Sequence, residues 1–408
     1  MRSPTVIVSD EFPAGYSSAG CSPAEPASAF PDVDILLDAG QKVVEHYSEW
    51  GREFIPRVSP EGFTPFIRVH LCLSAAKRLF YNRYLMNHRK LGRTGFDVSE
   101  IGYGAWGISG AQWIGASESD SLRALRTAIE HGIDFIDTAL AYGDGVSERI
   151  VGQIVRENNG RVRVATKVPP KNRIWPARPG IGIDDVFPYD YIMACTEESL
   201  RNLKVDCVDL QQLHVWNPEW IKRDDYRRAF EDLKASGKAR AVGVSINDHQ
   251  PDSAIELIET GLIDTVQVIY NVFDQTPQDN LFAACTKHNI GVIARVPFDE
   301  GSLTGRINED TVFPEGDFRN GYFKGDRKKQ VAEHVAAIVS DLGLANVSEL
   351  PTIAMRFCLS APAVSTVIPG MRSVSSVTGN VAASALGPLP AATLDKLHRH
   401  AWNRNFYA

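Results

Sequence analysis

The feature that most constrains the fold is an alternation between short apolar runs and longer amphipathic segments, which continues from Leu91 almost to the end of the chain. Eight of the runs are rich in Val and Ile and are predicted to be strands, with helices between them. Apolar strands separated by helices are typical of a parallel sheet covered on both faces. Eight such units in roughly 300 residues predict a (β/α)8 TIM barrel, and an open doubly wound sheet is the alternative. The predicted strands are residues 99–107, 133–139, 161–167, 205–214, 239–245, 263–271, 290–297 and 364–370.

The first 86 residues lack this alternation. They carry clusters of Pro, Ser and Ala and two short helical patterns, at residues 33–51 and 70–86. A β-hairpin is predicted around residues 93–95, ahead of the first strand. We therefore divide the chain into an appended N-terminal extension, residues 1–86, and the barrel, residues 87–408. The extension is predicted to be partly helical, partly disordered or upstream of the natural start, and its helices could equally pack on the barrel.

Composition excludes several classes of function. The net charge is −7 and there is no long basic run, so we expect no nucleic-acid partner. No apolar stretch is long enough to span a membrane, and the N-terminus lacks the apolar core of a signal peptide. The six cysteines have no CxxC or metal-like spacing, which predicts reduced thiols in a cytoplasmic protein without a metal site.

Titratable residues occur where three consecutive predicted strands end. The second strand ends in Asp137, with Tyr142 five residues later, the third ends in Lys167, and the fourth ends in His214. Active sites of barrels lie at the carboxyl ends of the strands, so these side chains are expected to converge. A lysine ammonium lowers the pKa of a nearby phenol, and an aspartate keeps the lysine charged. A neutral histidine can bind a substrate oxygen, so the set could protonate a carbonyl while another group delivers hydride.

Each of the four residues also has a simpler structural explanation. Asp137 could cap the turn that follows it, and Tyr142 could pack within its loop. Lys167 could be a surface lysine, and His214 could be a hydrogen-bonded structural residue. Their order on successive strands favours the catalytic interpretation.

Gly102, Gly104 and Gly107 have the GxGxxG spacing of a dinucleotide-binding loop. Such a loop opens a helix whose first N–H groups meet a pyrophosphate, but the first helical pattern begins only near Ser117. No acidic residue follows at the distance that a ribose contact needs. The spacing therefore does not indicate a Rossmann domain.

Several separate blocks resemble the aldo-keto reductases and occur in the order of that family. They are "RKLGRTGFDVSEIGYGAWG", "IDFIDTALAYGDGVSE", "VATKV", "VDLQQLHVW", "EDLKASGKARAVGVS" and "VIPGMR". The resemblance covers about residues 90–408 and implies a barrel that reversibly reduces aldehydes and ketones with NADPH. It implies Tyr142 as the general acid, tuned by Lys167 and Asp137. His214 would orient the carbonyl.

The resemblance also implies the cofactor contacts. The first strand end would border the nicotinamide, and the fifth and sixth would hold the carboxamide. The loop after the seventh strand would cradle the pyrophosphate, and the last loop would hold the adenosine end, with Arg372 near the 2′-phosphate and Asn380 near adenine. The implied cofactor-binding residues are Gly104, Trp106, Ser245, Asn247, Gln267, Arg295, Val296, Pro297, Phe298, Gly301, Gly305, Gly370, Arg372, Ser376 and Asn380.

Two departures from the family lie near the implied nicotinamide site. Arg295 stands where the family has an aromatic residue that stacks on the nicotinamide ring. Ile246 separates Ser245 from Asn247, whereas the family has the serine and asparagine side by side. The orientation of the nicotinamide ring and the carboxamide contact of Asn247 are therefore open.

A third departure lies in the adenosine motif, where Ser376 and Gly379 replace the common Gln or Arg and the following Glu. Because Arg372 is retained, NADP(H) is the preferred cofactor, and NAD(H) stays possible. The expected partner is a small carbonyl or alcohol substrate, and the loop sequences do not determine which one. The protein is expected to be a monomer or a loose oligomer.

The aromatic residues of the loops allow two interpretations. They could line a substrate cavity, or they could pack the insertion after the third strand against the barrel; they are Trp175, Phe187, Trp216 and Trp220. The C-terminal residues 398–408 could cover the barrel or the rim of the pocket.

Two other functions stay open. A cofactor-binding but weakly active protein of the same fold could be a redox-sensing partner of another protein. A sugar-phosphate isomerase or lyase would need a carboxylate base or a Schiff-base lysine, for which Lys167 is the candidate, and no dinucleotide.

Overall fold

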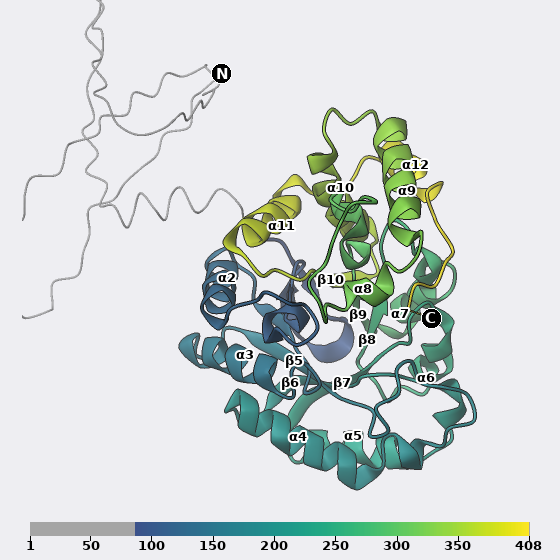
Figure 1. Cartoon of the computed structure of the whole chain (residues 1–408). Helices are drawn as coiled ribbons and strands as arrows, with labels where there is room; N and C mark the ends of the chain where they lie inside the picture. Colours follow the sequence, from purple (N-terminus) through teal and green to yellow (C-terminus); the bar gives the residue numbers. More distant parts are fainter. Residues whose placement is uncertain (1–85, 408) are drawn as a thin grey trace, which may run out of the picture. The chain divides into compact units, whose positions relative to one another are not determined.

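The computed structural model describes residues 86–407, so the predictions for residues 1–85 lie outside the described part of the chain (Figure 1). Eight parallel strands form one sheet, in which neighbours in the sequence are neighbours in the sheet. They coincide with the eight predicted strands. The strands are β3 (Tyr103–Gly104), β4 (Phe135–Asp137), β5 (Arg163–Val168), β6 (Val208–Leu213), β7 (Ala239–Ser245), β8 (Thr265–Ile269), β9 (Gly291–Arg295) and β10 (Val364–Ile368).

The sheet closes between its first and last strands. Ile101 bridges to Val367, and Gly104 bridges to Gly370, both in parallel register. A Cβ atom at Gly104 would lie 2.7 Å from the carbonyl oxygen of Ile368, so this closure requires glycine. The predicted (β/α)8 TIM barrel is confirmed, and the open-sheet alternative is wrong.

A helix follows every strand and covers the outside of the barrel (Figure 1). These helices are α2 (Glu118–Glu130), α3 (Val146–Glu157), α4 (Tyr189–Leu203), α5 (Asp225–Ala235), α6 (Ile255–Glu259), α7 (Leu281–His288), α10 (Leu350–Ser360) and α11 (Val374–Leu386). Within residues 86–407, three more helices interrupt or follow the repeat, namely α8 (Arg319–Tyr322), α9 (Arg327–Leu342) and α12 (Ala391–His398). Helices α9 and α12 lie side by side (Figure 1).

The first helix illustrates how local sequence sets these elements. The Ser117 hydroxyl accepts a hydrogen bond from the amide of Asp120 at 3.1 Å and so caps the start of α2. Leu125 and Ala128 lie on the face that is buried against the sheet. Gly132, with φ of +91°, ends the turn after the helix, where the sequence predicts a glycine stop.

A hairpin closes the end of the barrel at which the strands begin. It consists of β1 (His88–Lys90) and β2 (Asp97–Ser99), which pair antiparallel, and it confirms the predicted hairpin. Leu91, which lies in the turn between β1 and β2, contacts Gly291, the first residue of β9. Leu91 and Val98 are completely buried in a cluster with Phe135, Ala165, Leu210, Ala241, Ile293 and Ile368. The opposite end, where the strands finish, is left for a binding site.

Within residues 86–407, no helix has the length and apolar character that crossing a membrane requires. The same residues contain no group of three or more His, Cys, Asp or Glu side chains arranged to hold a metal ion.

The buried position of Leu91 in the hairpin predicts a specific stability change. Leu91→Ala leaves a cavity at the closed end of the barrel and is expected to lower the free energy of unfolding by about 2–5 kcal/mol. Leu386→Ala makes the same change at a residue that is 57% exposed and should alter it by less than about 0.5 kcal/mol. Urea unfolding measures both, and equal losses would show that the hairpin does not close the core.

Candidate active site

Four side chains meet at the end of the barrel where the strands finish. Asp137 is the last residue of β4, Lys167 is the penultimate residue of β5, and His214 directly follows β6. Tyr142 lies in the turn after β4. Hydrogen bonds and a ring contact connect them, so the structure brings together all four predicted catalytic residues.

Lys167 is at the centre of this group. Its Nζ donates to Oδ2 of Asp137 at 2.6 Å, to the carbonyl oxygen of Thr138 at 2.8 Å and to the hydroxyl oxygen of Tyr142 at 3.4 Å. Lys167 is completely buried and Asp137 is 2% exposed. An ammonium has three donors, so all three point to groups of this site. Because the Tyr142 oxygen accepts from Lys167, its own proton is free to be donated elsewhere.

The other carboxylate oxygen of Asp137 is also bound. Oδ1 accepts from Nε2 of Gln267 at 2.7 Å and from Nε2 of Gln212 at 3.5 Å. Both glutamines are buried. The sequence did not indicate that Gln267 supports Asp137, and its contact with a carboxamide stays a prediction.

The ion pair keeps Lys167 charged. Burial alone would lower the pKa of Lys167, but the Asp137 carboxylate and Tyr142 outweigh this effect, and the net shift is upward. The ammonium is therefore protonated throughout the neutral pH range.

The pKa of Tyr142 corrects the expectation drawn from the sequence. Burial of the phenol raises this pKa, and the Lys167 ammonium lowers it as expected, but burial dominates and the net shift is upward. Tyr142 therefore keeps its proton at neutral pH, which is the state that a proton donor needs.

His214 is a neutral imidazole in this site. Burial lowers its pKa well below the ordinary value, and the charges of Lys167 and Arg295 lower it further. Its ring lies edge-on to that of Tyr142, with 5.6 Å between the centroids and 72° between the planes. Its Nδ1 is buried and has no hydrogen-bond partner among residues 86–407. One ring nitrogen of His214 is therefore left without a hydrogen bond in this site.

Aromatic rings stand on both sides of Tyr142 and His214. Trp106, which follows β3, lies 6.2 Å from the Tyr142 ring, and its Nε1 donates to Gln112 at 2.7 Å. Trp175, from the insertion after β5, lies 5.8 Å from the His214 ring and is 41% exposed. A ligand that reaches Tyr142 and His214 therefore meets an apolar, aromatic rim.

The other loop aromatics pack the insertion rather than line the site. Trp220 lies 5.7 Å from Phe187 and 5.9 Å from Trp216, each pair edge-on, and all three are buried. Asn247 has a similar role, because its Oδ1 accepts from the amide of Ala177 at 3.2 Å and its Nδ2 donates to the Ala177 carbonyl at 3.1 Å. Its cofactor contact stays a prediction.

Two predicted cofactor residues lie at strand ends near the catalytic group. Ser245 is the last residue of β7 and is buried. Arg295 is the last residue of β9, and its Nη2 donates to Oδ1 of Asp248 at 2.7 Å. The charge of Arg295 also lowers the pKa of Tyr142 and of His214, although burial has the larger effect on each. Its ion pair with Asp248 was not indicated by the sequence.

The loop after β9 has an unusual backbone. Five of its residues have φ in the left-handed region, and they are Val296 (+58°), Asp299 (+50°), Glu300 (+54°), Gly301 (+108°) and Gly305 (+70°). Pro297 and Phe298 lie between them. Such strain persists only where the surroundings fix it, and it is common at ligand sites. Turns that combine right- and left-handed residues form anion-binding concavities, which fits the predicted pyrophosphate contact.

The residues predicted to bind the adenosine end lie in the loop after β10 and in α11, and they differ in their hydrogen bonding. Nη1 of Arg372 donates to the carbonyl of Ile114 at 3.1 Å, and no carboxylate of residues 86–407 forms an ion pair with it. Asn380 is 7% exposed, and its buried Nδ2 has no partner among the same residues. Ser376 instead forms a capping box with Ser373 at the start of α11. Arg372 thus carries a charge without an acidic partner among these residues, Asn380 has one unpartnered amide nitrogen, and Ser376 is engaged.

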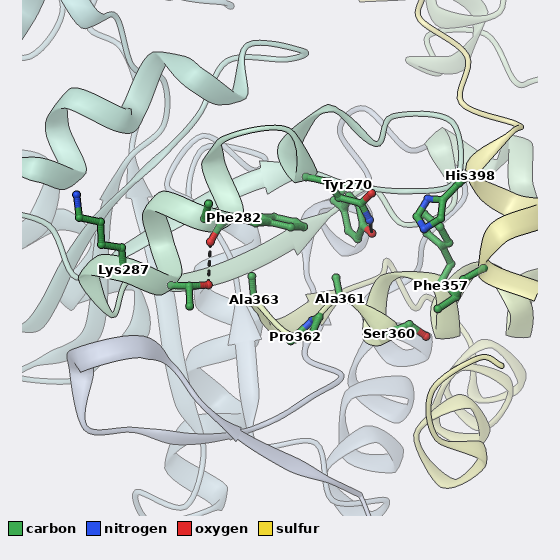
Figure 2. A pocket seen from close by; sticks show the side chains of 13 residues that line it. Tyr270, Phe282, Lys287, Phe357, Ser360, Ala361, Pro362, Ala363 and His398 are labelled. Atoms are coloured by element: carbon green, nitrogen blue, oxygen red, sulfur yellow. Dashed lines mark hydrogen bonds between the residues drawn. The ribbon is translucent and has the colours of Figure 1, made fainter. Parts of the chain in front are cut away.

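A cavity of about 730 Å³ lies away from this site, between α7, α10 and α12 (Figure 2). Phe282 and Lys287 of α7, Phe357 of α10 and His398 of α12 line it. It includes Pro362, just before β10, and therefore lies toward the opposite end of the barrel. None of the predicted site residues borders it.

The barrel and the Tyr142–Lys167–Asp137 group beside a neutral imidazole are those of a (β/α)8-barrel oxidoreductase. The sequence model of the aldo/keto reductase family matches residues 100–401. The chain belongs to this family, as the sequence motifs imply.

Known members are similar over most of their length. Aldo-keto reductase YhdN of Bacillus subtilis (strain 168) is 29% identical over 313 residues, which cover 72% of this chain and 89% of that protein. The holo form of aldo-keto reductase AKR11C1 from Bacillus halodurans has 27% identity and a TM-score of 0.62, covering 78% of this chain and 97% of that one. An aldo/keto reductase from Klebsiella pneumoniae, solved with NADP and acetate, has 25% identity and a TM-score of 0.57, covering 79% and 98%.

Proposed function

We propose that this protein is an NADP(H)-dependent oxidoreductase that reduces a small aldehyde or ketone to an alcohol and catalyses the reverse reaction. The observation that carries this proposal is the contact of the buried Lys167 ammonium with both Asp137 and the Tyr142 oxygen. This arrangement fixes the position of the phenol and leaves its proton free. Membership of the aldo/keto reductase family supports the same reaction class.

The proton step follows from the protonation states of the three groups. Tyr142 is neutral at pH 7, so it can donate its proton to the carbonyl oxygen as that oxygen gains negative charge. The phenolate left behind is stabilised by the Lys167 ammonium at 3.4 Å. His214 is neutral and cannot compete as an acid, so we assign it to hydrogen bonding of the substrate oxygen. When bound, a reduced nicotinamide supplies the hydride.

The cofactor assignment is supported by a guanidinium without an acidic partner and by an amide nitrogen without a hydrogen bond. Arg372 has no carboxylate partner among the described residues and can form charge-assisted hydrogen bonds to a 2′-phosphate. The unpartnered Nδ2 of Asn380 can bind adenine. The Klebsiella pneumoniae relative was solved with NADP, which supports NADP(H) over NAD(H). Residues 295–305 would hold the diphosphate, and Ser245, Gln267 and Arg295 would surround the nicotinamide.

The alternatives fit the site less well. A Schiff-base lyase needs a deprotonated, accessible lysine, but Lys167 is buried, paired with Asp137 and has a raised pKa. A redox-sensing protein with little turnover needs no assembled proton donor, whereas Tyr142, Lys167 and Asp137 are assembled here. The cytoplasmic location and the monomeric or loosely oligomeric state stay predictions.

Removal of the Tyr142 hydroxyl tests the proposal. Tyr142→Phe should lower kcat for aldehyde reduction by about 10²–10⁴-fold because the proton donor is lost, and it should leave the dissociation constant of NADPH unchanged. Tyr189→Phe removes a surface hydroxyl that binds Asp232 and is the matched control. NADPH oxidation with a panel of aldehydes measures both, and equal rates for wild type and Tyr142→Phe would refute the assignment.

A second variant tests the choice of cofactor. Arg372→Gln should weaken NADPH binding by about 10–100-fold, because a charge-assisted contact to the 2′-phosphate is lost. The affinity for NADH, which lacks this phosphate, should stay the same. Quenching of tryptophan fluorescence by each cofactor gives the constants. Tighter binding of NADH than of NADPH to the wild type would overturn the NADP(H) assignment.

A further inference from the structure

Two adjacent acidic residues lie in the loop that is proposed to hold a diphosphate. Asp299 is 2% exposed and Glu300 is 6% exposed, and both have a left-handed backbone. A buried carboxylate repels a nearby phosphate strongly, because the local dielectric constant is low. The loop can therefore accept a diphosphate only if the charge of each carboxyl group is balanced by a cation or removed by a proton.

Asp299 is neutralised by the C-terminal tail, residues 402–407. Its Oδ2 forms an ion pair with Nη2 of Arg404, which lies 105 residues further along the chain and has a side chain that is 7% exposed. The guanidinium is held between aromatic rings, at 4.2 Å from the ring centroid of Trp402 and 4.6 Å from that of Phe406. Tyr322 of α8 donates to the other oxygen of Asp299 at 3.2 Å.

Glu300 is bound by the same tail. The hydroxyl of Tyr407 donates to its Oε1 at 2.5 Å. The Tyr407 ring lies against Tyr322 at 4.9 Å and stacks on Phe318 at 6.1 Å. Phe318 in turn lies 5.1 Å from Trp106, so the tail continues the aromatic rim of the catalytic residues.

The charges around Glu300 come from several elements. Burial raises its pKa to about 7, with a further increase from Asp299, whereas Tyr407 and Arg295 act in the opposite direction. Asp248, in the loop after β7, also raises it. Burial and Glu300 raise the pKa of Tyr407 well above its ordinary value, so Tyr407 remains a donor. A diphosphate beside Glu300 has the same sign as Asp248 and favours the protonated carboxyl.

We propose that the C-terminal tail is a functional part of the diphosphate site, in which Arg404 neutralises Asp299 and Tyr407 holds Glu300 by a hydrogen bond, so that the loop after β9 accepts a dianionic ligand once Glu300 is protonated. This inference rests on the proposed function, in which residues 295–305 hold the diphosphate. Arg404 and Tyr407 are positioning residues, because they act through the loop.

Binding of NADPH to variants of the full chain tests the inference. Arg404→Gln exposes the diphosphate to the charge of Asp299 and should weaken NADPH binding about tenfold or more. The double variant Arg404→Gln/Asp299→Asn removes that charge and should restore the wild-type constant to within about threefold. Arg399→Gln, which removes a 62% exposed guanidinium paired with Asp341, is the matched control and should bind as wild type does.

A probe without a diphosphate separates local from general effects. Adenosine 2′-monophosphate should bind wild type and Arg404→Gln equally, because it does not reach the loop. A parallel loss for this probe would point to a damaged fold and overturn the inference.

Glu300→Gln provides an independent test that does not need Arg404. Wild-type affinity for NADPH should fall between pH 6 and pH 8 more steeply than that of Glu300→Gln, because only the wild type must hold a proton on Glu300 when the ligand binds. The 2′-phosphate of NADPH also titrates in this range, but its effect on the affinity is the same for both proteins and cancels when their pH profiles are compared.

Identical pH profiles, or an Arg404→Gln variant that binds NADPH normally, would overturn the inference and leave the proposed function intact. A wild type that binds neither NADPH nor NADH would overturn both.

Discussion

The buried ion pair between Lys167 and Asp137 is the interaction on which the rest of the site depends. Removing two charges from water is costly, and a buried pair is stable only when its remaining hydrogen-bonding positions are filled. Here the Thr138 carbonyl and the Tyr142 oxygen accept the remaining hydrogen bonds of the Lys167 ammonium. Gln267 donates a hydrogen bond to the second carboxylate oxygen of Asp137. The pair spans β4 and β5, so the register of the barrel fixes its geometry. The stability and the chemistry of this end of the barrel therefore share the same contacts.

Around this pair the mouth is built from segments that are distant in the sequence. Trp106 follows the first strand, Trp175 comes from the insertion after β5, and Phe318 comes from the segment before α8. The end of the barrel where the strands begin is filled by the hairpin around Leu91. Long loops on a rigid barrel can change substrate preference without disturbing the ion pair at its base.

The sequence predicted the strands and the residues at their ends, because these depend on short-range patterns along the chain. Apolar periodicity predicted all eight strands. Polar residues at predicted strand ends placed Lys167 and His214 at the same end of the barrel, because barrel topology alone brings such positions together. The ion pair of Arg295 with Asp248 and the bond of Tyr407 to Glu300 were missed, since they join side chains across loops of irregular path. The pKa of Tyr142 was misjudged because its burial is a property of the packed site and not of neighbouring residues in the sequence.

The central claim is that a neutral Tyr142, held by a permanently charged Lys167, donates the proton. The most direct measurement is the pH dependence of kcat/KM in both directions. Because the pKa of Tyr142 is raised, carbonyl reduction should be constant between pH 6 and pH 9, and alcohol oxidation should rise about tenfold per pH unit across the same range. A fall in reduction with a midpoint near pH 6–7 would reveal a different acid, such as a charged His214, and would contradict the account.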